Sequence, residues 1–141
     1  MFFKKEKENH KHNYLEKITA LLVYTAKIDE NYSKEEEEII ELTLSKIGVN
    51  KEKIKKIINE AKDLEENSNQ ILEFTREVKN MNEKDKINII EGLWRIIYSN
   101  KVADIYETNL MRRLAGLLYI DNKMMGDIKE KIKKEYSSWH I

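Results

Sequence analysis

The sequence predicts an all-α fold, a compact single domain of about seven helices with an internal helix–linker–helix repeat. The 141-residue chain contains no proline and only 4 glycines, so it holds few residues that break or weaken a helix. Apolar residues recur at a spacing near 3.6, and no segment alternates apolar and polar residues for long enough to indicate a strand. This length is sufficient for one domain with its own core.

Seven segments each carry one apolar stripe, the face that packs into a core. The expected helices cover about residues 14–26, 33–47, 50–64, 68–78, 82–97, 104–119 and 121–136. In the short fourth helix we assign Ile71, Leu72, Thr75 and Val78 to the stripe, and in the sixth Leu114 lies at its middle. Residues 1–13 are expected to form a flexible N-terminal lead-in, residues 14–136 the helical domain, and residues 137–141 a C-terminal tail.

Capping residues mark where the helices begin and end. Ser33 stands three residues before Glu36, and Asp104 three before Glu107, the spacing at which two side chains satisfy free N–H groups of a first turn. Gly48 is expected to end the second helix in the left-handed conformation. The caps expected for the third, fourth and fifth helices are Asn50, Ser68 and Asn82.

The two halves of the chain resemble each other. A shift of 71 residues lays apolar Ile18 on Ile89 and Leu22 on Leu93. The same shift aligns the linkers and capping boxes without a gap, pairing Asp29 with Asn100, Ser33 with Asp104 and Glu36 with Glu107. Amphipathic helices align easily, but caps and linker lengths in the same register indicate a duplicated unit.

Composition excludes several kinds of function. Lys+Arg and Asp+Glu both number 26, so no overall field attracts nucleic acid, and no nucleic-acid partner is expected. The absence of cysteine excludes disulfides and thiolate metal sites. No catalytic residues are predicted, because the histidines lie near the two ends of the sequence and no phosphate-binding loop appears. No apolar stretch approaches the roughly 20 residues of a membrane span, although Phe2 and Phe3 beside two lysines leave a peripheral membrane contact open.

Acidic residues are concentrated between residues 29 and 41. Three interpretations are open: an acidic first turn favoured by the helix dipole, a surface that docks a protein partner, or a weak Ca²⁺ or Mg²⁺ site. The candidate binding residues are Asp29, Glu30, Asn31 and Glu36, of which Asp29 and Glu36 are the candidate metal ligands. An EF-hand is excluded, since Lys34 and Ile40 replace its turn glycine and its bidentate glutamate. No other cofactor is indicated.

The stretch IYSNKVADIYETNLMRRLAGLLYID and the earlier AKIDENYSKEEEEII resemble the two halves of tellurite-resistance TerB-like proteins. In that family an Ala-Asp-Gly linker is followed, seven residues after its aspartate, by a glutamate. Asp29 and Glu36 match that spacing, whereas the second linker has Asn100 and Lys101 in place of aspartate and glycine. The resemblance implies a cytoplasmic helical bundle linked to tellurite or general stress response, which in related proteins is appended to co-chaperone or membrane partners.

The sequence therefore predicts a protein that acts by binding and not by catalysis. The leading hypothesis is a TerB-like interaction module with a protein partner of unknown identity. The alternative is a small divalent-cation-binding domain that uses the first linker around Asp29–Glu36. The equivalent second-copy positions, Asn100, Asp104 and Glu107, are interpreted as structural.

Overall fold

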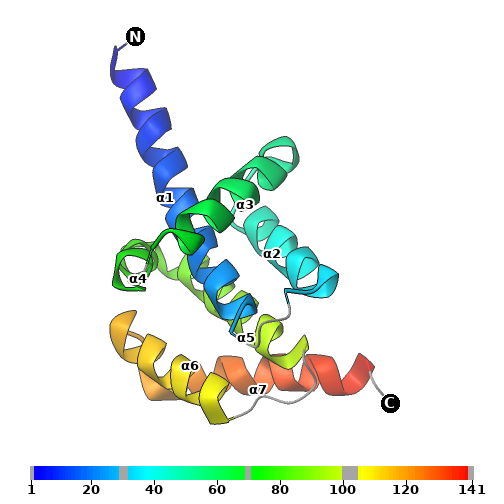
Figure 1. The fold of residues 1–141 in the computed structure, drawn as a ribbon. Coiled ribbons are helices and arrows are strands. Elements are labelled where there is room, and N and C mark those ends of the chain that lie inside the picture. Colours follow the sequence, from blue (N-terminus) through cyan, green and yellow to red (C-terminus); the bar gives the residue numbers. More distant parts are fainter. Residues whose placement is uncertain (1, 29–31, 69–70, 100–104, 140–141) are drawn as a thin grey trace.

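The computed structural model describes the backbone of residues 2–28, 32–68, 71–99 and 105–139, and the side chains of these residues except 2–12, 105–108 and 137–139. All elements in this part of the chain are helices, which confirms the predicted class (Figure 1). The seven helices are α1 (Phe2–Ala26), α2 (Lys34–Lys46), α3 (Lys51–Glu66), α4 (Leu72–Lys79), α5 (Glu83–Ser99), α6 (Ile105–Leu117) and α7 (Asn122–Trp139).

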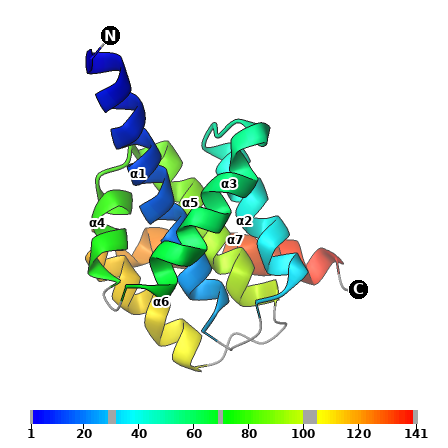
Figure 2. The ribbon, with the colours of Figure 1, turned by 45° about the horizontal axis from the view of Figure 1, so that its top comes forward.

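Helices α1 and α5 form the centre of the domain. Helix α1 packs against α2, α3, α4 and α5, while α5 also contacts α2 and α7. Figure 2 shows α3 and α4 on either side of α1, and Figure 1 shows α6 and α7 at the end of the bundle away from the N-terminus. The largest fully buried side chains include Ile18, Leu21 and Leu22 of α1 and Ile89, Ile90 and Leu93 of α5. Burial of these apolar side chains among the surrounding helices stabilises the domain.

The ends of the chain are more helical than the periodicity predicted. Helix α1 begins at Phe2, not at Tyr14, and so extends through the segment expected to be a flexible lead-in. Lys and Glu are good helix formers, and no proline or glycine separates this segment from the apolar stripe. Helix α7 likewise continues to Trp139, into the segment expected to be a tail.

The fourth helix differs from expectation in its start and in its buried face. It begins at Leu72 with Ile71 as the N-cap, so Ser68 does not cap it. Leu72 is exposed, and Phe74, absent from the predicted stripe, is buried instead. Leu72 and Phe74 lie two residues apart and cannot share one helix face. Helix α4 packs on α1, α5 and α6, and Phe74 lies on its buried side.

Local signals placed other helix ends correctly. The Asp85 N–H donates to Asn82 Oδ1 (2.8 Å), which confirms the cap of α5. Gly48 has φ of 93° after α2, the left-handed conformation that glycine adopts without strain. Asn50 is the N-cap of α3 but makes no side-chain capping bond. Helix α6 ends at Leu117, slightly before the expected Tyr119.

Helices α2 and α5 approach each other closely at Gly92. A Cβ atom at this position would lie 2.5 Å from Thr43 Oγ1, which is closer than van der Waals contact allows. The Thr43 hydroxyl is itself held, because it donates to the Ile39 carbonyl at 2.7 Å. Glycine at position 92 therefore permits the α2–α5 packing.

The duplicated unit is visible in the backbone. Under the 71-residue shift, the bounds of α2 fall on those of α6, and the first residue of α3 falls on the first residue of α7. After α2 the Val49 N–H donates to the Leu44 carbonyl (3.0 Å), and after α6 the Ile120 N–H donates to the Ala115 carbonyl (3.0 Å). The repeat therefore covers α1–α3 and α5–α7, with α4 between the two copies.

Candidate functional site

The predicted capping box at the start of α2 is present. The Ser33 N–H donates to Glu36 Oε1 (3.0 Å), and the Glu36 N–H donates to Ser33 Oγ (3.1 Å). Glu36 is completely buried. Its carboxylate therefore has an observed structural role, joining the end of the first linker to α2.

The other predicted site residues fall largely outside the described part of the chain. Asp29, Glu30 and Asn31 of the first linker, and Asn100 and Asp104 of the second, are not described. Glu107 is the third residue of α6, as Glu36 is the third of α2, but its side chain is not described. Binding or metal roles for the first-linker residues and Glu36 stay predictions.

A charged and aromatic cluster lies behind the capping box. Lys62 of α3 donates to Glu37 Oε1 of α2 at 2.7 Å, and its ammonium lies 4.6 Å from the centroid of the Tyr32 ring. Burial, followed by the nearby carboxylates of Glu37 and Glu36, raises the pKa of the Tyr32 phenol. These contacts hold α2 and α3 together at the end where the first linker arrives.

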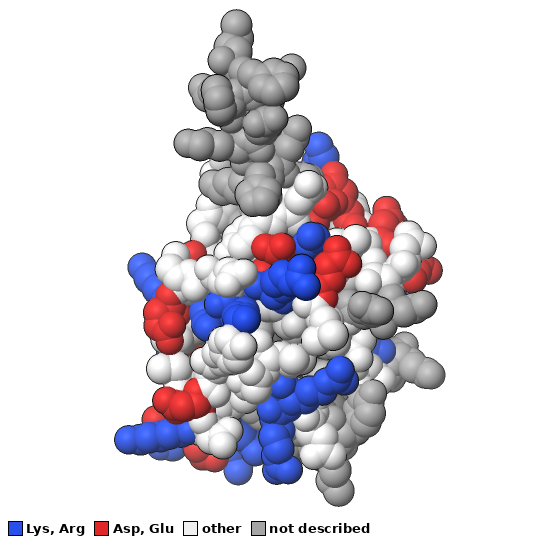
Figure 3. Space-filling view, turned by 90° about the vertical axis from the view of Figure 1, so that its left-hand side faces the viewer, with Lys and Arg blue, Asp and Glu red and all other residues white. Residues whose placement is uncertain are grey.

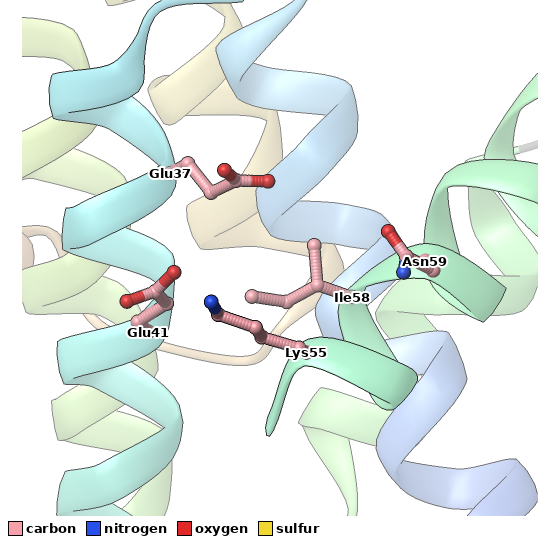
Figure 4. Close-up of a pocket in the computed structure, with 5 residues that line it drawn as sticks. All are labelled: Glu37, Glu41, Lys55, Ile58 and Asn59. Atoms are coloured by element: carbon pink, nitrogen blue, oxygen red, sulfur yellow. The ribbon is translucent and has the colours of Figure 1, made fainter. Parts of the chain in front are cut away.

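A polar hollow of about 180 Å³ opens between α2 and α3 beside this cluster. Its lining comprises Glu37 and Glu41 of α2 and Lys55, Ile58 and Asn59 of α3. Figure 4 shows the side chains of the two helices directed toward the space between them. The hollow combines carboxylates, an ammonium group and an amide around one apolar side chain, a set that can both donate and accept hydrogen bonds. The sequence predicted the acidic face of α2 but not the contribution of Lys55 and Asn59.

A second charged cluster joins α5 to α7. Arg95 is buried, and its Nε donates to Glu135 Oε2 at 3.0 Å, while Lys131 Nζ donates to Glu91 Oε1 at 2.9 Å. The Tyr136 hydroxyl donates to the Arg95 carbonyl (3.1 Å). Burial, followed by the nearby carboxylates of Glu35 and Glu135, raises the pKa of Tyr136 to about 12. Because these charges are paired within the domain, the cluster is structural.

No group of three or more His, Cys, Asp or Glu side chains suited to hold a metal ion occurs among the described residues. Asp29, the other predicted ligand, is outside that set. In the same part of the chain, no helix combines the length and apolar character needed to cross a bilayer.

Residues 15–130 match a family model described as tellurite resistance protein TerB. The match includes most of both copies of the repeat. The chain belongs to the TerB family. No curated protein and no solved structure matches the chain. The resemblance inferred from the two linkers is therefore confirmed for the family.

Proposed function

We propose that this TerB-family chain is a non-enzymatic, cytoplasmic interaction module that acts in tellurite resistance or a related stress response by binding another protein. The association with tellurite resistance is carried over from the family. The observation that supports binding is the polar hollow between α2 and α3.

The lining of the hollow retains unused bonding capacity. Glu41, Lys55 and Asn59 make no hydrogen bond or ion pair with other described residues, whereas Glu37 is paired with Lys62. Polar groups exposed in a concave site are available to a partner. The Lys62–Glu37 pair and the Tyr32 ring fix the two helices, so little order has to be gained on binding.

The mixture of charges favours a protein partner over a bare cation. Lys55 lies in the same hollow as the two carboxylates and would repel a divalent ion there. A protein segment can offer a basic side chain to Glu41, an acidic one to Lys55 and an amide to Asn59. A cation site on the first linker, at Asp29 and Glu36, stays a separate prediction.

Site-specific photo-crosslinking in cells exposed to tellurite tests this proposal. A photoreactive residue replacing Asn59 should capture one defined protein, while the same residue replacing Lys53, on the opposite face of α3, should not. Lys55→Glu should reduce the capture at position 59 and lower survival in tellurite. Equal capture at positions 53 and 59, or capture unaffected by Lys55→Glu, would refute the proposal for this hollow.

A further inference from the structure

The described part of the chain exposes three large apolar side chains. They are Leu42 of α2 (48% exposed), Leu72 of α4 (49%) and Tyr119 after α6 (74%). Single exposed apolar residues are common on protein surfaces. These three are unusual because each lies beside charged side chains. Leu42 lies beside acidic residues of α2, Leu72 lies beside basic residues of α4, and the Tyr119 ring lies against Lys79 of α4.

Exposed Leu72 and Arg76 and half-buried Lys79 form one ridge of α4. Their spacing, i, i+4 and i+7, places them on a single helix face. Lys79 Nζ lies 4.1 Å from the centroid of the Tyr119 ring, a cation–π contact that fixes the ammonium at the end of the ridge. Within the described residues, neither Arg76 nor Lys79 forms an ion pair. We name this surface the basic ridge.

The backbone of Tyr119 is in the left-handed conformation, which favours glycine over a residue with a side chain. Its φ is 55°, and the residue at the equivalent position of the first copy is Gly48. A left-handed conformation is unfavourable for a residue that carries a Cβ atom. The exposed ring also contributes little to the core. The conformation belongs to the end of α6, where the Ile120 N–H donates to the Ala115 carbonyl, and it places the ring against Lys79.

Leu42, Glu38 and Glu35 form the corresponding exposed ridge of α2. Read toward the N-terminus, their spacing is i, i−4 and i−7. Both glutamates are exposed and form no ion pair within the described residues. This acidic ridge is a different face of α2 from the one that lines the hollow.

The two ridges are complementary when their helices run antiparallel. In that register Leu42 meets Leu72, Glu38 meets Arg76 and Glu35 meets Lys79. We propose that the acidic ridge of one copy of this chain docks antiparallel on the basic ridge of a second copy. All three exposed apolar side chains then lie in or beside one interface.

The position of the ridges determines the kind of assembly. Helices α2 and α4 lie on opposite sides of the molecule in both ribbon views (Figures 1 and 2). Figure 3 views the side that carries α4 in Figure 1, where several groups of Lys and Arg side chains lie among Asp and Glu side chains. Because the two ridges are separate surfaces, the contact is heterologous and leaves one free ridge at each end. Such contacts produce rings or open filaments.

A second copy explains this surface better than a polyanion does. A nucleic acid would pair with Arg76 and Lys79 but would leave Leu72 uncovered, and it would not account for the acidic ridge. The matching ligand, with the same spacing and the opposite charge, is present in the chain itself.

Sedimentation velocity over a concentration series tests the proposal. The wild-type chain should show a sedimentation coefficient that rises with concentration and falls at high salt. Glu38→Arg and Arg76→Glu should each weaken self-association by at least about tenfold, because each puts like charges opposite one another. The double variant Glu38→Arg/Arg76→Glu restores an opposite-charge pair and should recover the association. Glu52→Arg, an equal charge change on exposed α3, is the control.

Tyr119→Gly tests whether the Tyr119 ring contributes to self-association without affecting the stability of the domain. It should leave the domain at least as stable as the wild type, since it removes left-handed strain. It should also weaken association about two- to fivefold, because Lys79 loses its aromatic partner. Circular dichroism should show that every variant is folded.

A chain that stays monomeric at all concentrations, or a double variant as weak as the single ones, would overturn the proposal. Loss of binding to a polyanion in Arg76→Glu with unchanged self-association would also overturn it. The result is independent of the hollow, because Lys55→Glu should leave self-association unchanged and Glu38→Arg should leave crosslinking at position 59 unchanged.

Discussion

Replacing Gly92 with alanine should destabilise the domain, although alanine is the better helix former. The new Cβ would lie 2.5 Å from Thr43 Oγ1 and 2.9 Å from Thr43 Cγ2. Thr43 is β-branched, buried and bonded to the Ile39 carbonyl, so its side chain cannot rotate away without loss. Overpacking costs about 1–3 kcal/mol and a lost hydrogen bond about 1 kcal/mol, against a helix-propensity gain of up to about 1 kcal/mol. We expect a net loss on the order of 1–3 kcal/mol.

Urea unfolding followed by circular dichroism measures this change, and a second substitution identifies its cause. Thr43→Ala removes both of the closest atoms, so Gly92→Ala should cost less in that background than alone. Gly116→Ala is the matched control, because a Cβ there meets nothing within 4 Å. It should be neutral or stabilise by up to about 1 kcal/mol. If Gly92→Ala changes the free energy of unfolding no more than Gly116→Ala does, that result would contradict the close approach of α2 and α5.

Three further outcomes are expected from the same unfolding assay. Leu114→Ala should cost about 2–5 kcal/mol, because Leu114 is fully buried in α6 and its truncation leaves a cavity; a loss under about 0.5 kcal/mol would contradict this. Ser33→Ala should cost about 0.5–2 kcal/mol, since the Glu36 N–H loses its acceptor; an unchanged urea midpoint would contradict the capping box. Stability should fall as pH rises from 10 toward 12, because the unfolded chain releases the Tyr136 proton that the folded chain, with a pKa of about 12, retains. Tyr136→Phe should make that fall shallower, and an unchanged slope would exclude Tyr136 as its source.

Features determined by neighbouring residues could be predicted from the sequence. The capping box of Ser33 and Glu36, the cap at Asn82 and the left-handed Gly48 depend on residues within one or two turns, and all are present. The helical class followed from the same local periodicity. The helix at residues 2–13 was missed because periodicity detects a buried face, not helical backbone itself.

Features determined by distant residues could not be predicted. The choice between Leu72 and Phe74 as the buried side chain depends on α1, more than forty residues earlier. The pairing of Arg95 with Glu135 joins positions 40 apart, and the pattern gave no reason to bury an arginine. The hollow needs a gap between α2 and α3, whereas the sequence shows only the two faces. Of the predicted site, only Glu36 has a described side chain.

At one pair of equivalent positions, the two copies make a contact between the same two helices with different side chains. Lys27 forms an ion pair with Glu65 at 2.8 Å. Under the 71-residue shift these residues fall on Tyr98 and Tyr136, whose rings lie 6.4 Å apart. An ionic contact in one copy is thus an aromatic contact in the other.

The residues that line the hollow have no chemically similar counterparts in the second copy. Glu41 and Lys55 fall on Arg112 and Gly126, so the second copy lacks this chemistry. Because α6 keeps the bounds of α2 with Arg112 at the matching position, the backbone does not require a carboxylate there. Glu41→Arg/Lys55→Gly should therefore remain folded, at a cost of about 1 kcal/mol for the new glycine, and should lose the crosslink at position 59. If crosslinking persists in this double variant, the partner does not bind through Glu41 and Lys55.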